Sequence, residues 1–201
     1  MYENLLRDPP SPDKAAVEPS YGWESFPGNA QDFVDSNLYN SYAVNDLRQS
    51  AFYSLTSDSI PVFDGAYVGS TGYFFSGIGT DEMYLTRAEG YARQGNVALA
   101  MSDLNTLLQA RWLTGFFTTL SASTADEALA IILNERNKEL PFTELIRWID
   151  LRRLNRDSRF AKTLFRNLNG QVYSLPPNDN RYVYPIPPDE IKLSGIEQNP
   201  R

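Results

Sequence analysis

The sequence predicts a mainly α-helical protein in which helix pairs support an irregular, loop-rich lobe of aromatic residues. Three observations lead to this fold class. Apolar residues follow helical spacing over 79–111, a second and highly charged helix pair is predicted over 123–155, and short aromatic segments alternate with glycines over 31–78. Aromatic runs between glycines favour extended segments and turns, so the third region is expected to be the least regular.

The first helix pair has the clearest pattern. Apolar residues repeat at positions three and four apart over 84–92 and again over 97–108, with Gly95 and Asn96 between the two runs. The spacing of its aromatic and small residues also matches a tetratricopeptide unit, in which two helices approach closely. An ordinary pair of antiparallel helices is the alternative interpretation of this segment.

The second helix pair has recognisable ends. Ser123 and Thr124 precede acidic residues by three positions, a pattern that resembles a capping box and marks a helix N-terminus. Pro141 should end this helix, because proline cannot continue the helical hydrogen bonds. A further helix is expected over about 143–155, with apolar residues interleaved among its charges.

Two interpretations compete for the charges ERNKEL and RWIDLRR of this second pair. Its carboxylates could serve as the acid and base of glycoside hydrolysis, which needs two carboxyl groups beside the scissile bond. They could instead form ion pairs across the helix interface, and neighbouring cations would then lower the carboxyl pKa values and remove a general acid. We favour a structural charge network of Glu135, Glu139, Arg147, Asp150 and Arg152, with Arg153 as a further cation.

Prolines characterise both ends of the chain. Residues 1–30 contain five prolines, which forbid a long helix and predict a loop or linker. The tail 171–201 is also rich in proline, and only Val172–Leu175 and Arg181–Tyr184 are expected to be short extended segments. A free tail of this composition could bind an SH3-type domain, but its interleaved tyrosines favour packing against the rest of the chain.

The composition excludes several classes of function. The formal net charge is −7, whereas a nucleic-acid interface needs clustered lysine and arginine, so no nucleic-acid partner is expected. The chain has no histidine and no cysteine, which removes serine–histidine and cysteine–histidine catalysis and the usual zinc sites. No cofactor or metal is therefore expected, and no apolar run reaches the roughly 20 residues of a membrane span.

Four blocks, in order, resemble one known family. They are DEMYLTRAEGYARQGN with the following ALAMSDLNTLLQAR, then ILNERNKEL, then IRWIDLRRL, and finally YVYPIPPDEI with the closing QNPR. The segments NDLR and FSGIGTDE add to the likeness. The chain resembles the SusD/RagB nutrient-binding outer-membrane lipoproteins of Bacteroidetes-type bacteria over about residues 33–201, and the resemblance implies tetratricopeptide-like helix pairs beside a loop-rich lobe.

The resemblance concerns the C-terminal portion of that family. Its members begin with a lipoprotein signal and a lipidated cysteine, followed by further scaffold helices, and the present sequence contains neither feature. We therefore expect a SusD-like C-terminal region over 31–201, corresponding to a fragment or a truncated reading frame. By resemblance, the location would be the outer membrane, facing the cell exterior.

The family resemblance also implies a function. Such a protein binds a nutrient, most often an oligosaccharide, and passes it to a TonB-dependent, SusC-like transporter without changing it chemically. A tetratricopeptide-like scaffold for protein interaction is the alternative, and a glycosidase that uses only carboxylates is a third hypothesis.

Sugar rings stack on aromatic side chains while their hydroxyl groups bond to amides and charged groups. The candidate ligand-binding residues lie outside the periodic helices and beside polar residues. They are Trp23, Tyr39, Tyr42, Tyr73 and Asn45. For each aromatic residue, packing against the scaffold is the alternative role, because large aromatic side chains are mostly buried.

Overall fold

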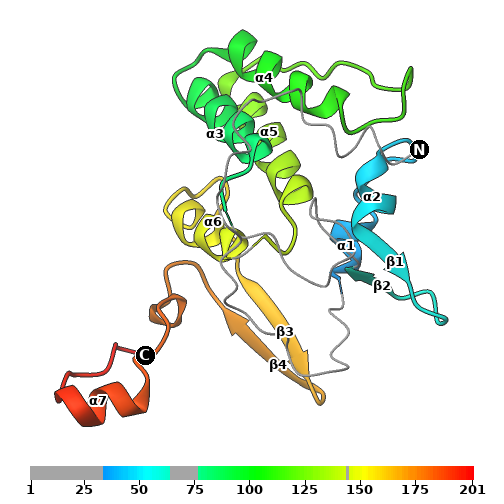
Figure 1. Ribbon diagram of the computed structural model, residues 1–201. Helices are drawn as coiled ribbons and strands as arrows, with labels where there is room; N and C mark the ends of the chain where they lie inside the picture. The colour runs from blue at the N-terminus through cyan, green and yellow to red at the C-terminus, as the bar shows by residue number, and fades with distance from the viewer. Residues whose placement is uncertain (1–33, 64–76, 144) are drawn as a thin grey trace. The chain divides into compact units, whose positions relative to one another are not determined.

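The computed structural model describes residues 34–63, 77–143 and 145–201 of the chain (Figure 1). The predicted linker over 1–30 and the candidates Trp23 and Tyr73 lie outside the described residues. Contacts between backbone positions divide the chain into two compact units, 1–144 and 145–201, and we describe each by itself. This division falls within the helix pair predicted over 123–155.

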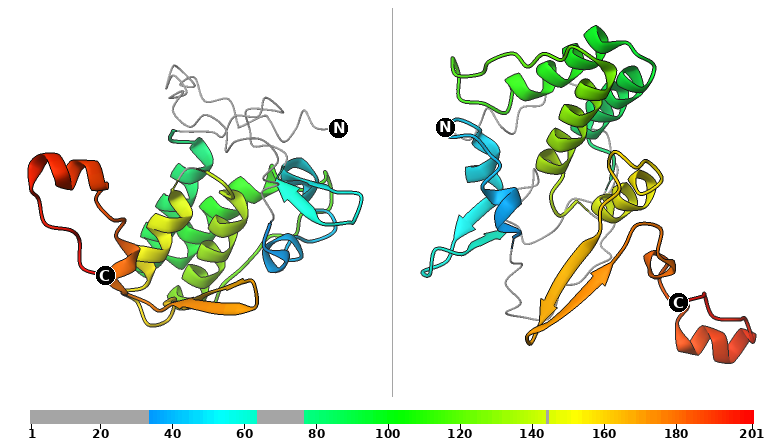
Figure 2. Two further views of the ribbon diagram at one scale, coloured as in Figure 1. Left: turned by 90° about the horizontal axis from the view of Figure 1, so that it is seen from below. Right: turned by 180° about the vertical axis from the view of Figure 1, so that it is seen from behind.

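Three helices form the scaffold of the first unit: α3 (Thr80–Arg93), α4 (Val97–Gln109) and α5 (Ala125–Glu139). Helix α3 packs against both other helices, and the three remain side by side in the further views of Figure 2. Their shared core contains several fully buried alanines, which allow the backbones to approach closely. The innermost side chains are Leu85, Ala88, Ala92, Ala100, Leu104, Leu108, Ala128, Leu129 and Ile132. The mainly α-helical fold class is therefore confirmed.

The ends of these helices follow from local chemistry. Gly95 has φ of +81°, a conformation that glycine adopts at little cost, and it ends α3 before α4 begins. At the start of α5, the Thr124 hydroxyl accepts a hydrogen bond from the Glu127 amide at 3.1 Å. The Glu127 carboxylate in turn accepts one from the Ser123 amide at 2.7 Å. The predicted cap is confirmed, and the return bond from Glu127 reaches the residue before the N-cap instead of the N-cap itself.

A small lobe precedes the scaffold in the chain. It comprises α1 (Ser36–Tyr39), α2 (Leu47–Phe52) and the antiparallel strands β1 (Tyr53–Leu55) and β2 (Pro61–Phe63). Its buried residues form an aromatic cluster, which consists of Val34, Tyr42, Phe52 and Tyr53. The sequence predicts a short helix near 30–38, but it does not predict α2. Helix α2 begins at its N-cap Asp46, whose side chain accepts a hydrogen bond from the Arg48 amide.

The second unit begins with α6 (Ile146–Leu154) and continues with the hairpin of β3 (Leu164–Leu168) and β4 (Gln171–Leu175). A 3₁₀ turn (Asn180–Tyr182) and α7 (Pro188–Ser194) follow. The prediction of an extended segment over Arg181–Tyr184 is therefore wrong at its start. Helix α7 is compatible with the prolines because Pro188 occupies its first position, where no amide is needed.

Aromatic contacts connect the tail of the second unit to α6. The ring of Trp148 lies 4.9 Å from that of Tyr182 and 5.7 Å from that of Tyr184, centroid to centroid. The Trp148 indole also donates a hydrogen bond to the Tyr182 carbonyl oxygen at 3.1 Å. Both tyrosine rings, one at the end of the 3₁₀ turn and one just after it, therefore pack against the same tryptophan of α6.

Candidate functional site

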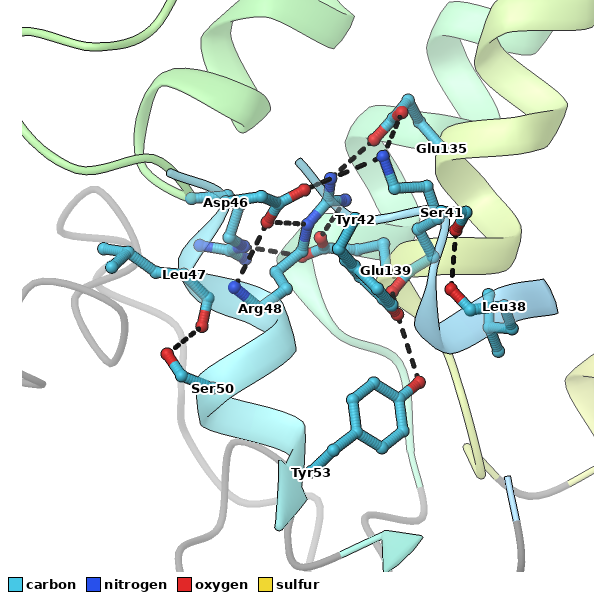
Figure 3. Close-up of polar contacts among 12 residues, drawn as sticks. Leu38, Ser41, Tyr42, Asp46, Leu47, Arg48, Ser50, Tyr53, Glu135 and Glu139 are labelled. Atoms are coloured by element: carbon cyan, nitrogen blue, oxygen red, sulfur yellow. Dashed lines mark hydrogen bonds and ion pairs between the residues drawn. The ribbon is translucent and has the colours of Figure 1, made fainter. Parts of the chain in front are cut away.

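The described part of the chain brings a set of opposite charges into a buried position between the lobe and α5 (Figure 3). We call this set the ion-pair cluster. Its members are Asp46, Arg48, Arg111, Glu135, Lys138 and Glu139, all buried. It contains three carboxylates and three cations, so its formal charges cancel.

Arg48 is the centre of the cluster and is fully buried. Its guanidinium group donates to both carboxylate oxygens of Asp46, from Nε at 2.9 Å and from Nη2 at 2.6 Å. This bidentate geometry is the strongest arrangement for an arginine and a carboxylate. Because Asp46 also caps α2, the same side chain fixes the start of the helix and the direction of the arginine.

Helix α5 supplies the facing groups. Glu135, Lys138 and Glu139 are three and four positions apart and so share one face of the helix. Arg48 donates to Glu135 Oε2 at 2.6 Å and to Glu139 Oε2 at 3.1 Å. Lys138 donates to Glu135 Oε1 at 2.9 Å and lies 3.7 Å from Asp46 Oδ2.

Arg111, directly after α4, completes the cluster. Its Nε atom donates to Glu139 Oε1 at 2.6 Å, so Glu139 holds one arginine with each oxygen. The Arg111 carbonyl oxygen accepts a hydrogen bond from the Leu47 amide at 2.9 Å. Three separate segments of the chain, at 46–48, at 111 and at 135–139, therefore meet in one buried network.

Two tyrosines extend the network into the aromatic cluster. The Tyr42 hydroxyl donates to the Lys138 carbonyl oxygen at 2.7 Å and lies 3.1 Å from the Tyr53 hydroxyl, which is left to act as the donor between the two. Burial raises the pKa of Tyr53 to about 12 and that of Tyr42 further still. Burial alone would lower the pKa of Arg48, but its hydrogen bond to Asp46 and the charges of Glu139 and Glu135 raise it overall.

Comparison with known proteins gives the family. Residues 80–201 match the family model described as the SusD family. The chain belongs to the SusD family. A SusD-like carbohydrate binding protein from Bacteroides vulgatus has a solved structure that is 21% identical, with a TM-score of 0.51, over 81% of this chain. A SusD-like protein from Bacteroides fragilis is 24% identical, with a TM-score of 0.44, over 70% of this chain.

Each of these matches covers less than half of the related chain. The matched region spans 40% of the Bacteroides vulgatus chain and 30% of the Bacteroides fragilis chain. At this level of identity, the Bacteroides vulgatus structure supports a shared SusD-like fold. A search of curated proteins found no match.

The structure places the candidate ligand residues of this SusD-family chain in different surroundings. Tyr42 is only 6% exposed and belongs to the aromatic cluster, which is the packing role weighed for it. Tyr39 is half-buried and meets the ring of Tyr53 edge to face at 5.7 Å between centroids. Asn45 is also half-buried, and its carbonyl oxygen accepts a hydrogen bond from the Leu113 amide at 3.0 Å.

The ion pairs of Glu135 and Glu139 described above come from cations that the sequence does not single out. Glu135 and Glu139 lie in a buried network, but the ion pairs described above come from Arg48, Arg111 and Lys138. Three other predicted members, Arg147, Asp150 and Arg152, are on α6 in the second unit, where Asp150 accepts a hydrogen bond from Arg153 at 2.7 Å. Their pairing with Glu135 and Glu139 stays a prediction.

Sequence reasoning missed Asp46, Arg48, Arg111 and Lys138 as cluster members. The available signal was the pattern Asp-Leu-Arg at 46–48, in which an N-cap residue stands two positions before a cation. Within the described residues, no group of acidic side chains is arranged to hold a metal ion. A small hollow beside the cluster, bordered by Phe52, Phe63 and Pro141, has space for little more than a water molecule.

Proposed function

We propose that this SusD-family protein binds an oligosaccharide or related nutrient at the cell surface and passes it to a TonB-dependent, SusC-like transporter. The observation that carries the proposal is the match of residues 80–201 to the SusD family. One relative with the same fold is described as a carbohydrate binding protein. The proposal places the protein at the outer membrane, and no described helix is long and apolar enough to cross a membrane.

The arrangement of lobe and scaffold supports this role. Within its described residues, 34–63, the lobe contains two three-residue strands and two short helices, and these elements are too small to be stable alone. The ion-pair cluster and the Tyr42 hydroxyl attach it to α5. A rigidly attached aromatic lobe suits sugar binding, because a site that is ordered before binding avoids the cost of ordering loops.

The rival glycosidase hypothesis finds little support in the cluster. Glu135 and Glu139 are 6% and 1% exposed, and every carboxylate oxygen of the two accepts a hydrogen bond from a cation. A general acid needs access to the glycosidic oxygen, and the burial of these carboxylates and their hydrogen bonds to cations leave no oxygen open to a substrate. We therefore propose that these carboxylates hold the lobe in place and that the protein binds its ligand without reaction.

Ligand binding can be tested with immobilised glycans and with soluble polysaccharides in native affinity gels. Wild-type protein is expected to bind at least one glycan, and Trp23→Ala and Tyr39→Ala are expected to weaken binding. Tyr173→Ala, which removes an exposed tyrosine from the hairpin of the second unit, is the matched control. Binding that neither Trp23→Ala nor Tyr39→Ala weakens would contradict the proposed residues.

The same preparation distinguishes the rival functions. New reducing ends released from a bound polysaccharide by pure protein would support the glycosidase. Affinity purification of the tagged protein from membranes of its native host should recover a TonB-dependent transporter. Recovery of a soluble protein instead, without glycan binding, would favour the interaction scaffold.

A further inference from the structure

The tip of the β3–β4 hairpin joins Asn169 directly to Gly170. Both residues are exposed, and they form the loop between the paired residues Leu168 and Gln171. Their φ angles of +51° and +80° match a two-residue type I′ turn. The pairing of the two strands therefore holds Asn169 and Gly170 in a tight turn.

Asn-Gly is also the dipeptide in which asparagine is chemically least stable. Asparagine is a thermolabile residue because the backbone nitrogen of the next residue can attack its carboxamide carbon and close a five-membered ring. A side chain on that next residue hinders the attack, and glycine has none. No other asparagine of the sequence is followed by glycine, so the sequence alone distinguishes Asn169 from the rest.

The two reacting groups are accessible at the tip. Within the part of the chain that the structure describes, the Asn169 side chain and the Gly170 amide make no hydrogen bond. A Cβ atom placed on Gly170 would meet no atom within 4 Å, so this side of the turn is open to solvent. Water and base can therefore reach both groups.

The conformation of the turn controls the reaction. A type I′ turn holds the Gly170 nitrogen on the side of the Cα–C bond away from the Asn169 side chain, so the ring closes only after the turn opens. Opening requires little free energy here, because this sheet has two strands among the described residues and 165–174 are all exposed. A two-stranded hairpin without further cover is only marginally stable.

We propose that Asn169 is a self-modification site, where transient opening of the hairpin lets the Gly170 nitrogen displace ammonia from the Asn169 carboxamide. The new N–C bond closes a succinimide ring, and the proton lost from the Gly170 nitrogen is balanced by the proton that the leaving NH₂ group takes up. Water then adds to one of the two ring carbonyls. The products are aspartate or isoaspartate, and neither step consumes an oxidant or a reductant.

The modification has a direct effect on the hairpin. In isoaspartate the chain runs through the former side-chain carbon, which adds one atom to the backbone between Leu168 and Gln171. A two-residue turn fixes the register of its strands, so the lengthened turn cannot restore the pairing of β3 with β4. Either product also adds one negative charge at the tip. This inference does not depend on any ligand of the protein.

The test follows the full chain during incubation in mildly alkaline buffer, with trypsin digestion and mass spectrometry of successive samples. Cleavage after Arg166 and Arg181 releases residues 167–181 as one peptide. The exposed asparagines of this peptide are Asn167, Asn169, Asn178 and Asn180. Fragmentation assigns each mass gain of about 1 Da to one asparagine and separates isoaspartate from aspartate. Asn169 should convert first, and the other three are controls within the same peptide.

Two matched variants test the role of hairpin opening. Val172→Gly weakens β4 and leaves both reacting groups in place, so it should speed the conversion about threefold to tenfold. Val44→Gly makes the same change at a position of the first unit that is 98% exposed, and the rate should stay unchanged. A synthetic peptide of residues 167–181, which has no stable hairpin, should convert about threefold to thirtyfold faster than the protein.

Circular dichroism shows that both variants are folded before the rates are compared. Conversion of Asn169 no faster than that of Asn167 would refute the modification site. A rate that Val172→Gly leaves unchanged, or that is as high in the protein as in the synthetic peptide, would refute the control by hairpin opening.

Discussion

Replacing Glu139 with Gln removes one negative charge from the ion-pair cluster and keeps the size of the side chain. In the wild type, Glu139 is 1% exposed and accepts hydrogen bonds from Arg111 at 2.6 Å and from Arg48 at 3.1 Å. A glutamine can offer its carbonyl oxygen to one arginine only. Its NH₂ group then faces the other arginine, donor against donor.

The expected loss of stability follows from the burial of Glu139 and from the charge balance of the ion-pair cluster. With Glu139 neutral, the cluster has three cations and two carboxylates, and one positive charge is left without compensation away from water. Breaking a buried ion pair by removing one partner costs about 3–5 kcal/mol. Since a domain of this size has about 5–15 kcal/mol of total stability, Glu139→Gln should remove a large fraction of it.

Urea unfolding followed by circular dichroism and by tryptophan fluorescence measures this loss. Asp103→Asn is the matched control, because it makes the same chemical change in a two-point pair with Arg87, whose side chain is 58% exposed. Exposed ion pairs contribute about 0–1 kcal/mol, so the control should change the free energy of unfolding little. Similar losses in the two variants would refute the structural role of Glu139.

A double variant separates charge balance from packing. Arg111→Gln combined with Glu139→Gln restores a neutral cluster, so the two changes together should cost less than the sum of the single changes. Strict additivity would show that the uncompensated charge is not the cause. A stable Glu139→Gln protein that loses binding or activity would instead assign this carboxylate to the ligand.

Three further predictions concern local features. The buried phenols of Tyr42 and Tyr53 hold their protons to higher pH than the unfolded value of about 10. The stability that they contribute should therefore be complete below about pH 10 and fall as pH rises toward 12, as measured by urea unfolding. The loss of phenolate absorbance in Tyr42→Phe and Tyr53→Phe should show that both phenols ionise above pH 10. Thr124→Ala should cost about 1 kcal/mol in urea unfolding, whereas Thr124→Ser should cost little; equal losses would contradict the cap. Gly170→Ala, at φ of +80°, should cost the β3–β4 hairpin about 1 kcal/mol, seen as faster amide exchange; unchanged exchange would contradict the strained turn.

The scaffold helices were predictable because a local sequence pattern, either apolar spacing or a helix cap, indicates the position of each helix. The apolar spacing over 84–92 and 97–108 is repeated without interruption, and the core of α3 and α4 uses those positions. The start of α5 follows from a side chain and an amide three residues apart. Interactions between near neighbours along the chain can be deduced from the sequence alone.

The ion-pair cluster was only partly predictable because its contacts join distant segments. Arg48 lies 91 residues from Glu139 in the chain, and Arg111 lies 28 residues from it. In the sequence, an arginine that becomes buried cannot be distinguished from an arginine that lies on a solvated helix face. Charge alone indicated that Glu135 and Glu139 needed cations, but it could not choose among the arginines of the chain.

The tail contains two further local signals that predict its structure. Asn169 and Gly170 have φ of +51° and +80°, as a two-residue type I′ turn requires, and Asn-Gly is its preferred sequence. These two residues predict the β3–β4 hairpin. Pro188 indicates the start of α7, because proline is favoured at the first helical position, and Gly195, at φ of +69°, provides the matching C-terminal stop.

The attachment of the lobe explains why a cluster of charges occupies a position where apolar residues would serve stability equally well. A buried ion pair is often no more stabilising than an apolar replacement, but it tolerates few alternative arrangements. Arg48 makes contacts with Asp46, Glu135 and Glu139 at once, which only one placement of α2 against α5 satisfies. The same segment, one residue earlier, is bound to the chain that follows α4, because the Asn45 carbonyl oxygen accepts a hydrogen bond from the Leu113 amide. If the cluster has this role, loosening it should weaken ligand binding through the position of the lobe, even in a variant such as Lys138→Met that leaves every proposed ligand contact in place.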